Sequence, residues 1–291
     1  MRREAEREGR MIEVLRAGPL TTVQDLGRPG FAHLGVPRAG ALDGPALRLA
    51  NRLAGNPEGA AALEVTAGGC SLRLATAGTV ALTGAFAPLS VGGRPAAFAL
   101  PVPVPAGAVV TVGRAVHGVR SYLAVGGGIA VEPVLGSRSA DTLSGLGPAP
   151  LRDGDRLPVG AYVSPSTVDF VPWRPPPLSL ALRIRLGPRA DWFTAEAVAA
   201  LLGTAYTVSP VSNRVGARLA GAALPRAVAG ELPSEGIVLG AVQVPANGQP
   251  LIFLADHPTT GGYPVIGVVD DVTPLAQAVP GTTVTFHGPE R

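Results

Sequence analysis

The stretch SLRLATAGTVALTG, residues 71–84, holds two short apolar runs separated by Thr, Ala and Gly, and this pattern decides the fold class. Similar strand-sized runs recur at residues 88–93, 108–114, 120–129 and 155–160. Many short strands with regularly spaced turn residues are typical of an antiparallel barrel that is closed or nearly closed. The content of Gly 39 and Pro 30, with only 4% aromatic residues, also favours a turn-rich β protein with cores of Val, Leu and Ala.

Two segments have helical rather than strand periodicity. Residues 40–56, GALDGPALRLANRLAGN, predict a helix that has Asp43 as its N-cap and ends at Gly55. Residues 189–203, RADWFTAEAVAALLG, predict a second helix. The expected buried faces consist of Leu42, Ala46, Leu49, Ala50 and Leu53 in the first helix, and of Trp192, Ala195, Val198, Ala199 and Leu202 in the second.

The length of 291 residues is enough for two domains that each bury a core. Strands followed by a helix and further strands occur at residues 12–163 and again at 179–291, and a Pro-rich linker is expected at 164–178. Residues 1–11 are highly charged and are expected to form a disordered N-terminal extension. We therefore predict a mainly β protein with two barrel domains, each carrying one or two short helices.

The charge pattern excludes several functions. All 24 basic residues are arginines, which excludes a Schiff-base lysine, a biotinylated lysine and the phosphate loop GxxxxGK[ST]. The net charge of +3 comes without a basic run, so we expect no nucleic-acid partner. The charged N-terminus and the lack of an apolar span of about twenty residues predict a soluble, cytoplasmic protein with no membrane attachment.

Cysteine and histidine usage argues against a metal site. Cys70 is the only cysteine, so neither an intrachain disulfide nor a cysteine cluster can form, and its setting GGCSLRLA predicts a buried strand residue. His33, His117, His257 and His287 lack the paired spacing of zinc or iron ligands. We expect no metal.

Two further motifs can be read as catalytic or as structural. GGGI, residues 126–129, follows an apolar run, but Pro133 interrupts any helix after it, so a glycine-rich turn is favoured over a nucleotide phosphate loop. No GxSxG motif occurs, and Ser137 has no histidine nearby in sequence, so a serine hydrolase is disfavoured.

Polar residues concentrate in irregular segments, chiefly residues 21–43 and 255–265, where β proteins usually place functional groups. Paired arginines with acid and amide neighbours suit the binding of a carboxylate, and carboxylates in such a pocket can act as bases. The locking of turns by the same side chains is the alternative. The candidate catalytic residues are Asp25, Glu235 and Asp256. The candidate substrate-binding residues are Gln24, Arg28, Arg38, Asn213, Arg214, Arg218, Ser234, Gln243, Thr259, Thr260 and Tyr263.

Several long motifs resemble the biotin-dependent carboxyltransferase family called KipA. They are VQDLGRPGFAHLGVPRAGALD (23–43), LGSRSADTLSGLG (135–147), SPVSNRVGARL (209–219), LPSEGIVLGAVQVPANGQP (232–250) and ADHPTTGGYPVIGVV (255–269). This family includes the C component of bacterial 5-oxoprolinase (PxpC), proteins described as allophanate hydrolase subunit 2, and part of the carboxyltransferase region of urea carboxylase. Ala140 and His257 depart from the residues that many relatives carry, Thr and Gln respectively.

The resemblance implies two cyclophilin-like β-barrel domains and a role as the C component of a 5-oxoprolinase. The implied reaction is the ATP-dependent opening of 5-oxo-L-proline to L-glutamate, an amidohydrolase activity. The implied partners are a KipI-like B component (PxpB) and a LamB/YcsF-like A component (PxpA), and ATP would bind this chain or one of these partners. In this interpretation Arg28, Arg38, Arg214 and Arg218 stabilise phosphate or carboxylate charge. One of the three candidate carboxylates would serve as the base or would orient a polar partner.

Two other functions are compatible with the same resemblance. The first is a carboxyltransferase component that uses carboxybiotin from a separate carrier, with a urea-like amide as acceptor; biotin is expected only in this case. The second is a regulatory protein that acts by binding a KipI-like protein. The substrate in either enzymatic reading is a small amide or lactam.

Overall fold

The computed structural model describes residues 10–161, 172–230 and 232–288. The chain forms two compact units, each built from three segments. Unit 1 consists of Met1–Arg28, Ala39–Asp141 and Gly145–Pro176, and unit 2 consists of Pro29–Arg38, Thr142–Ser144 and Pro177–Arg291. Residues 1–9 of the expected extension and 164–171 of the expected linker lie outside the described residues.

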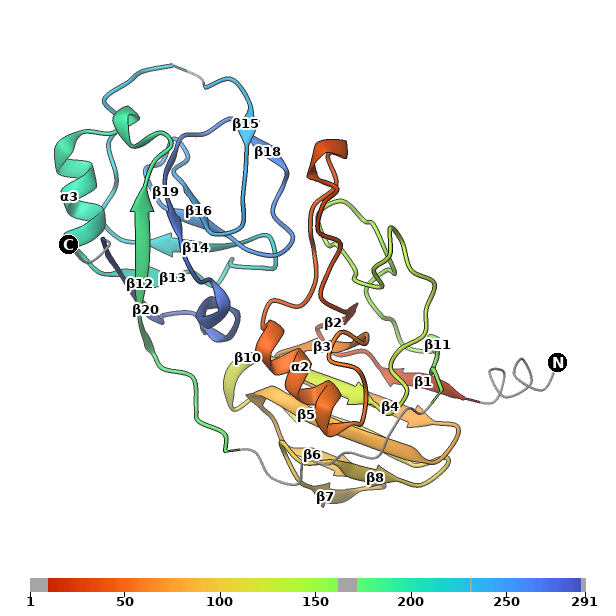
Figure 1. Cartoon of the computed structure of the whole chain (residues 1–291). Helices are drawn as coiled ribbons and strands as arrows, with labels where there is room; N and C mark the ends of the chain where they lie inside the picture. Colours follow the sequence, from red (N-terminus) through yellow and green to blue (C-terminus); the bar gives the residue numbers. More distant parts are fainter. Residues whose placement is uncertain (1–9, 162–171, 231, 289–291) are drawn as a thin grey trace. The chain divides into compact units, whose positions relative to one another are not determined.

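Unit 1 contains two antiparallel sheets (Figure 1). One has six strands in the order β11-β1-β4-β9-β6-β7, and the other has five in the order β2-β3-β10-β5-β8. The strands are β1 (Met11–Arg16), β2 (Leu20–Gln24), β3 (Ala62–Thr66), β4 (Gly68–Leu74), β5 (Gly78–Phe86), β6 (Leu89–Val91), β7 (Arg94–Ala96), β8 (Val102–Val104), β9 (Val109–Arg114), β10 (His117–Val125) and β11 (Arg156–Pro158).

The core of unit 1 is formed by apolar side chains from one face of each sheet. In β4 the side chains of Cys70, Leu72 and Leu74 alternate with more exposed ones and enter a cluster that also holds Leu82 and Leu123 of the five-stranded sheet. Each fully buried leucine contributes about 1.5–3 kcal/mol to folding through the hydrophobic effect. The prediction of a buried strand cysteine is confirmed, and burial raises the pKa of the Cys70 thiol to about 11.

Helix α2 (Gly44–Leu53) covers the other face of the five-stranded sheet, where Ala62, Ala81 and Tyr122 contribute to its contact cluster. The predicted N-cap is confirmed, because the Asp43 carboxylate accepts a hydrogen bond of 2.9 Å from the backbone N–H of Ala46. The predicted buried face is right for Leu42, Ala46, Ala50 and Leu53 but wrong for Leu49, which is only partly buried, while Leu47 is fully buried.

The end of the expected linker that the structure describes contacts unit 1. The Trp173 indole N–H donates a hydrogen bond of 3.0 Å to the carbonyl of Gly84. Its ring lies 5.5 Å from that of Phe86 and 5.7 Å from that of Phe98, centroid to centroid. Edge-to-face and tilted arrangements of this kind stabilise aromatic contacts.

Unit 2 is a closed barrel in the order β12-β19-β16-β17-β14-β13-β20, together with a separate two-stranded sheet β15-β18. Neighbouring barrel strands are antiparallel except β12 and β20, which are parallel. The strands are β12 (Ser179–Leu186), β13 (Tyr206–Val208), β14 (Gly216–Ala220), β15 (Glu235–Gly236), β16 (Ala241–Gln243), β17 (Leu251–Phe253), β18 (Thr260–Gly261), β19 (Val265–Val269) and β20 (Thr283–His287).

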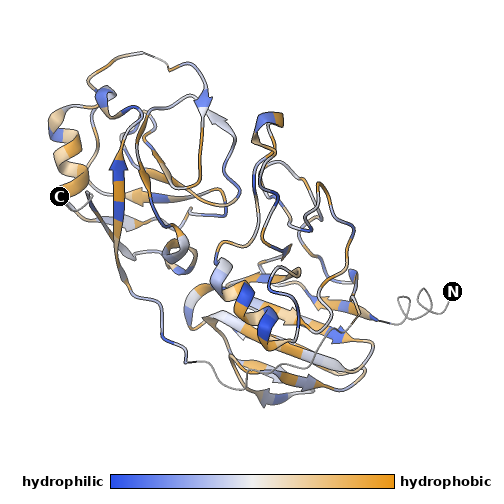
Figure 2. Cartoon of the chain, in the orientation of Figure 1, coloured by the Kyte–Doolittle hydropathy of each residue, from blue (hydrophilic) through white to orange (hydrophobic). Residues whose placement is uncertain are grey.

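The second helix is shorter than predicted and buries a different face. Residues Ala190–Trp192 form a 3-10 turn, and α3 (Ala195–Gly203) begins after the N-cap Thr194. Its buried residues are Ala197 and Leu201, whereas Ala195, Ala199 and Leu202 of the predicted face are exposed, and Trp192 and Val198 are only partly buried. The helix is apolar on nearly every side (Figure 2), so its periodicity could not select the buried face.

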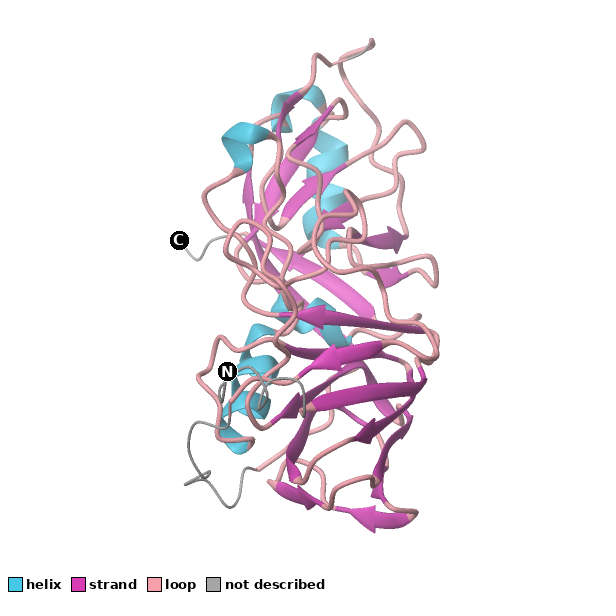
Figure 3. Cartoon of the chain, turned by 90° about the vertical axis from the view of Figure 1, so that its right-hand side faces the viewer, coloured by secondary structure: helices cyan, strands magenta, loops and turns pink. Residues whose placement is uncertain are grey.

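Strands and loops dominate both units, with few helical segments (Figure 3). The predicted mainly β fold with few short helices is therefore confirmed.

The glycine-rich motif at residues 126–129 is a tight turn, as predicted, and no helix follows it. Gly127 has a φ of +104°, and a Cβ there would lie 2.1 Å from the carbonyl oxygen of Gly160. The N–H of Gly127 donates to Asn56 Oδ1 at 2.7 Å, and that of Gly128 donates to the Val125 carbonyl at 2.8 Å. The N–H groups of Gly127 and Gly128 therefore already form hydrogen bonds within and beside the turn.

Replacing Gly127 with alanine is expected to destabilise unit 1 by about 3 kcal/mol or more, because the new methyl group must displace backbone in a strained conformation. Gly107→Ala is the matched control, since Gly107 also has a positive φ of +74° but nothing lies within 4 Å of its added Cβ. The free energy of unfolding of Gly107→Ala should fall by only about 1 kcal/mol. Chemical denaturation of both variants gives the comparison, and equal losses would contradict the packing argument.

Candidate functional site

The carboxylate of Asp25 is the centre of a polar cluster in unit 1. Its Oδ1 accepts hydrogen bonds from the hydroxyls of Ser137 and Ser139, both at 2.6 Å, and from the N–H of Gly27 at 2.8 Å. Its Oδ2 accepts from the N–H of Arg138 at 2.6 Å. Asp25 thus links the segment after β2 to residues 137–139. Four donors occupy the acceptor sites of an ionised carboxylate, an arrangement suited to positioning these loops.

Arg28 and Gln24 hold the same two segments together. The Arg28 guanidinium is 1% exposed and donates to the carbonyls of Val134 and Ser139. Within the described ranges, neither its Nη1 nor the Oε1 of Gln24 has a hydrogen-bond partner. The Gln24 amide nitrogen donates to the carbonyl of Ala140 at 3.0 Å. The structure therefore brings Gln24, Asp25 and Arg28 together, as expected of a site, with uncommitted donor and acceptor atoms.

The loop Pro29–Arg38, which belongs to unit 2, carries the exposed candidate Arg38. The residues flanking this loop are fixed, since Ala41 N–H donates to the Asp25 carbonyl at 2.9 Å and a Cβ on Gly40 would lie 2.9 Å from the nitrogen of Gly27. Arg38 has no side-chain partner among the described residues. Its guanidinium is available to solvent.

A buried carboxylate, Glu64 of β3, was not expected from the sequence. Glu64 is 1% exposed and its Oε2 accepts a hydrogen bond of 2.7 Å from the Tyr122 hydroxyl and one of 3.2 Å from the N–H of Leu42. The same hydroxyl accepts from the N–H of Asp43 at 2.8 Å. Burial raises the pKa of Tyr122 well above its ordinary value, so the hydroxyl remains a donor to Glu64. These bonds position the chain that leads into α2.

In unit 2, Arg214 and Asp256 form a buried, bidentate ion pair. Arg214 Nε donates to Oδ2 at 2.9 Å and Nη2 to Oδ1 at 2.8 Å, and the side chains are 1% and 0% exposed. Asp256 Oδ2 also accepts from the N–H and the hydroxyl of Thr142, at 2.9 and 2.7 Å. Geometry of this kind compensates for the removal of both charges from water. Asp256 therefore joins two of the three chain segments of unit 2, residues 142–144 and 177–291.

Glu235 of β15 is the more accessible candidate carboxylate. Its side chain is 31% exposed, and both its oxygens accept hydrogen bonds from Arg189, whose side chain is 37% exposed. These hydrogen bonds lower the pKa of Glu235 below its ordinary value, with the charge of Arg189 adding to the effect. Glu235 is consequently ionised at neutral pH and is a weaker base than an unpaired glutamate.

The candidates around β15 and β18 lie close to one another. Gln243 is 5% exposed and donates to the Tyr263 carbonyl at 3.0 Å, and a Cβ on Gly261 would lie 2.8 Å from its amide nitrogen. Thr260 pairs with Gly236 in the two-stranded sheet. Further members of this region are Ser234, which is exposed, and Thr259, whose carbonyl accepts from Ile237 at 2.9 Å.

Asn213 and Arg218 are located in and after an exposed turn of unit 2. Asn213 Oδ1 accepts from the N–H groups of Val215 and Gly216 at 2.9 and 3.2 Å, which is a turn-locking role. The Arg218 side chain is exposed and has no side-chain partner among the described residues. It borders a hollow of about 520 Å³ that Asn247 also lines.

Four residues with notable contacts were not expected as functional candidates from the sequence: Glu64, Thr142, Arg189 and Arg226. Thr142 follows the motif GSRSAD directly, so its place beside a candidate loop could have been noticed. The partners of Glu64, Arg189 and Arg226 are set by strand pairing and loop packing, for which a single sequence carries little signal. In the described part of the chain, no group of three or more His, Cys, Asp or Glu side chains is arranged to hold a metal ion. None of the described helices is long and apolar enough to cross a membrane.

The combination of strand-rich units and loop-borne acids and arginines corresponds to a known class of domain. Residues 34–288 match the family described as carboxyltransferase domain, subdomain A and B. The chain belongs to this family, and the resemblance noted in the sequence is confirmed.

One protein of known designation and two solved structures show close similarity to this chain. The chain is 41% identical to the C component of 5-oxoprolinase from Escherichia coli K12 over 285 residues, which cover 95% of this chain and 90% of the relative. The crystal structure of TTHA0988 has a TM-score of 0.85 at 38% identity, covering 95% of this chain and 55% of that one. The K. lactis urea amidolyase structure has a TM-score of 0.87 at 29% identity, covering 95% of this chain but only 18% of that one.

Asp256→Asn is expected to lower the free energy of unfolding by about 3–5 kcal/mol, because it leaves the buried Arg214 without its carboxylate partner. Asp270→Asn is the control, since Asp270 pairs with the exposed Arg183 and Arg185. That control should lose far less stability. Thermal and denaturant unfolding would show the difference, and a neutral Asp256→Asn would contradict the stabilising role.

Arg189→Gln is expected to raise the pKa of Glu235 toward its ordinary value of about 4.3. Because the pKa is depressed in the folded chain, the pair contributes stability above the ordinary carboxyl range and loses it as the pH falls through the lowered value. Carboxyl-carbon NMR titration measures the shift, with Arg73→Gln in unit 1 as control. An unchanged Glu235 pKa would refute the assigned cause.

Proposed function

We propose that this chain is the C component of a multi-subunit 5-oxoprolinase, an ATP-dependent amidohydrolase that opens 5-oxo-L-proline to L-glutamate. The observation that carries the proposal is the 41% identity to the C component of the Escherichia coli enzyme, which spans 95% of this chain and 90% of that protein. Nearly the whole length of the Escherichia coli protein aligns with this chain, so its role can be proposed for this chain. The urea amidolyase is a weaker guide, because only 18% of its chain is covered.

The chemistry of the lactam explains which groups the reaction needs. A lactam carbonyl is a poor electrophile, and its opening develops negative charge on oxygen that cationic donors stabilise. Arg38 and Arg218 have exposed guanidinium groups without side-chain partners among the described residues, and Arg28 has an unpartnered Nη1. We propose that one of these arginines binds the carboxylate of the substrate or an anionic intermediate. Glu235, as the accessible carboxylate, is the proposed group that orients a polar partner.

The described residues offer no phosphate loop for ATP. In the one glycine-rich motif that resembles such a loop, the amides of Gly127 and Gly128 donate to Asn56 and to the Val125 carbonyl. They cannot also bind phosphate without opening the turn. We therefore place ATP on a partner protein and derive no step that involves nucleotide from this chain.

The proposal includes two partners, a KipI-like B component (PxpB) and a LamB/YcsF-like A component (PxpA), in a cytoplasmic complex. The designation of the relative as one subunit of an enzyme supports this part. Neither partner is expected to be needed for the folding of the chain described here, since each unit has its own buried core.

A second candidate function is carboxyl transfer from carboxybiotin to a urea-like amide. The observation in its favour is the TM-score of 0.87 to the K. lactis urea amidolyase structure. The biotin would have to be carried by another protein or domain, because this sequence contains no lysine to which it could be attached. Glu235 and the exposed arginines would then face a carboxylated cofactor instead of a lactam.

Reconstitution tests the proposal directly. The chain is combined with the presumed PxpA and PxpB partners and assayed for glutamate and ADP formed from 5-oxo-L-proline and ATP. Glutamate is expected only from the complete mixture, in equal amount to ADP. A Glu235→Gln chain should assemble normally but lower turnover by about tenfold or more.

Glu58→Gln is the matched control, because Glu58 is an exposed carboxylate paired with Arg52 in unit 1. Its turnover should remain unchanged. A well-folded complete complex that forms no glutamate, but in which the chain transfers the labelled carboxyl group of carboxybiotin to urea and so yields labelled N-carboxyurea and free biotin, would replace the proposal with carboxyl transfer.

A further inference from the structure

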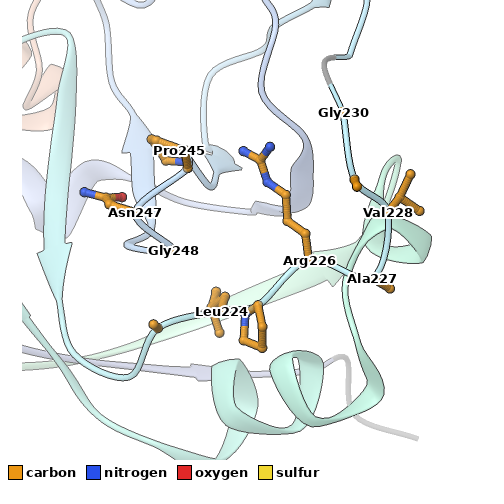
Figure 4. Close-up of a pocket in the computed structure, with 12 residues that line it drawn as sticks. Leu224, Arg226, Ala227, Val228, Gly230, Pro245, Asn247 and Gly248 are labelled. Atoms are coloured by element: carbon orange, nitrogen blue, oxygen red, sulfur yellow. The ribbon is translucent and has the colours of Figure 1, made fainter.

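A hollow of about 480 Å³ in unit 2 lies outside the residues singled out from the sequence (Figure 4). It is formed by residues 223–230 and by the turn 245–248. Its frame is fixed, since Leu224 N–H donates to the Gly248 carbonyl at 2.9 Å and Ala227 N–H donates to the Trp192 carbonyl at 2.8 Å. Lining residues such as Asn247 and Val228 are exposed, so the hollow opens to solvent. Its volume is in the range of small-molecule sites.

Arg226 is the charged group of this hollow. In Figure 4 its side chain extends from residues 223–230 toward Pro245. The guanidinium is oriented by a 2.8 Å hydrogen bond from Nη2 to the Val244 carbonyl and by the Tyr263 ring, whose centroid lies 5.7 Å from Cζ. Because a cation above an aromatic face is held by the ring quadrupole, these two contacts orient the group before any ligand binds.

No acidic side chain among the described residues balances this charge. Among the described residues, the lining contains no carboxylate and Arg226 forms no ion pair. The candidate acids of unit 2, Glu235 and Asp256, are already paired with Arg189 and Arg214. The Arg226 Nε is buried and has no hydrogen-bond partner among the described residues. An anionic ligand that contacts the remaining guanidinium N–H groups would form charge-assisted hydrogen bonds with this cation.

We propose that this hollow binds a small organic carboxylate, with its anionic group on Arg226 and its apolar or ring-shaped body against Leu224, Val228 and Pro245. A guanidinium held in one orientation favours a planar carboxylate, and a lining in which Arg226 is the one described charged side chain favours a ligand with a single negative charge. The proposal does not depend on the proposed function, because it concerns binding to this chain alone.

Isothermal titration calorimetry on the full chain tests the site, with 5-oxo-L-proline and benzoate as probes and neutral 5-oxo-L-prolinamide as the uncharged comparison. At least one acid should bind saturably, and the amide should bind at least tenfold more weakly. Arg226→Gln should raise the Kd of that acid at least tenfold, while Arg226→Lys should recover part of the affinity. Arg185→Gln, which removes an exposed arginine outside the hollow, should leave the Kd unchanged.

Ala229→Trp is a second variant that keeps the charge but fills the hollow. It should abolish binding, and thermal unfolding of each variant verifies that the barrel remains folded. Absence of saturable binding by both acids, equal binding of the amide, or unchanged affinity in folded Arg226→Gln or Ala229→Trp would each overturn the proposal. Because neither ATP nor partner proteins are present, these results are separate from those of the turnover assay.

Discussion

The need to compensate buried negative charge governs how the loops of this protein are arranged. Asp25, Glu64 and Asp256 are 7%, 1% and 0% exposed, and each accepts hydrogen bonds from residues of the same unit that are distant in sequence. An ionised carboxylate removed from water is costly unless hydrogen bonds and an opposite charge replace its hydration. The loops that supply those donors are consequently held in one arrangement, and strands alone would not specify it. Of the candidate site residues, Asp25, Asp256 and Arg214 take part in these contacts directly.

The three carboxylates solve the same problem in different ways. Asp25 relies on hydroxyl and backbone donors, and Asp256 on a bidentate arginine with threonine. Glu64 relies on a tyrosine, a backbone N–H and the buried guanidinium of Arg120 at 3.7 Å. Glu235 differs from all of them because it remains partly open to solvent and is held by one arginine. A group that must contact a substrate needs such access, whereas a fully coordinated carboxylate serves better to fix the geometry around it.

Local sequence rules predicted the parts of the fold that depend on neighbouring residues. The N-cap at Asp43, the buried strand position of Cys70 and the turn at residues 126–129 all follow from short-range stereochemistry. The buried face of α3 could not be predicted, because a helix that is apolar on most sides carries no preference until it packs. The candidate site likewise has parts that the local sequence predicts and parts that it does not. Its loops could be predicted from composition. The pairing of Glu235 with Arg189 and of Asp256 with Thr142 depends on residues distant in sequence, so it could not.

The division of each unit into three chain segments limits how this domain can be rearranged in evolution or in the laboratory. A fragment that begins at Pro177 contains the whole barrel of unit 2 but lacks residues 29–38 and 142–144. Asp256 in such a fragment would keep Arg214 and lose both donors of Thr142. Gene fission at the expected linker would therefore place residues 29–38 and 142–144 of unit 2 on a different polypeptide from its barrel. Fusion of other domains to the ends of the chain would keep all three segments of each unit in one polypeptide.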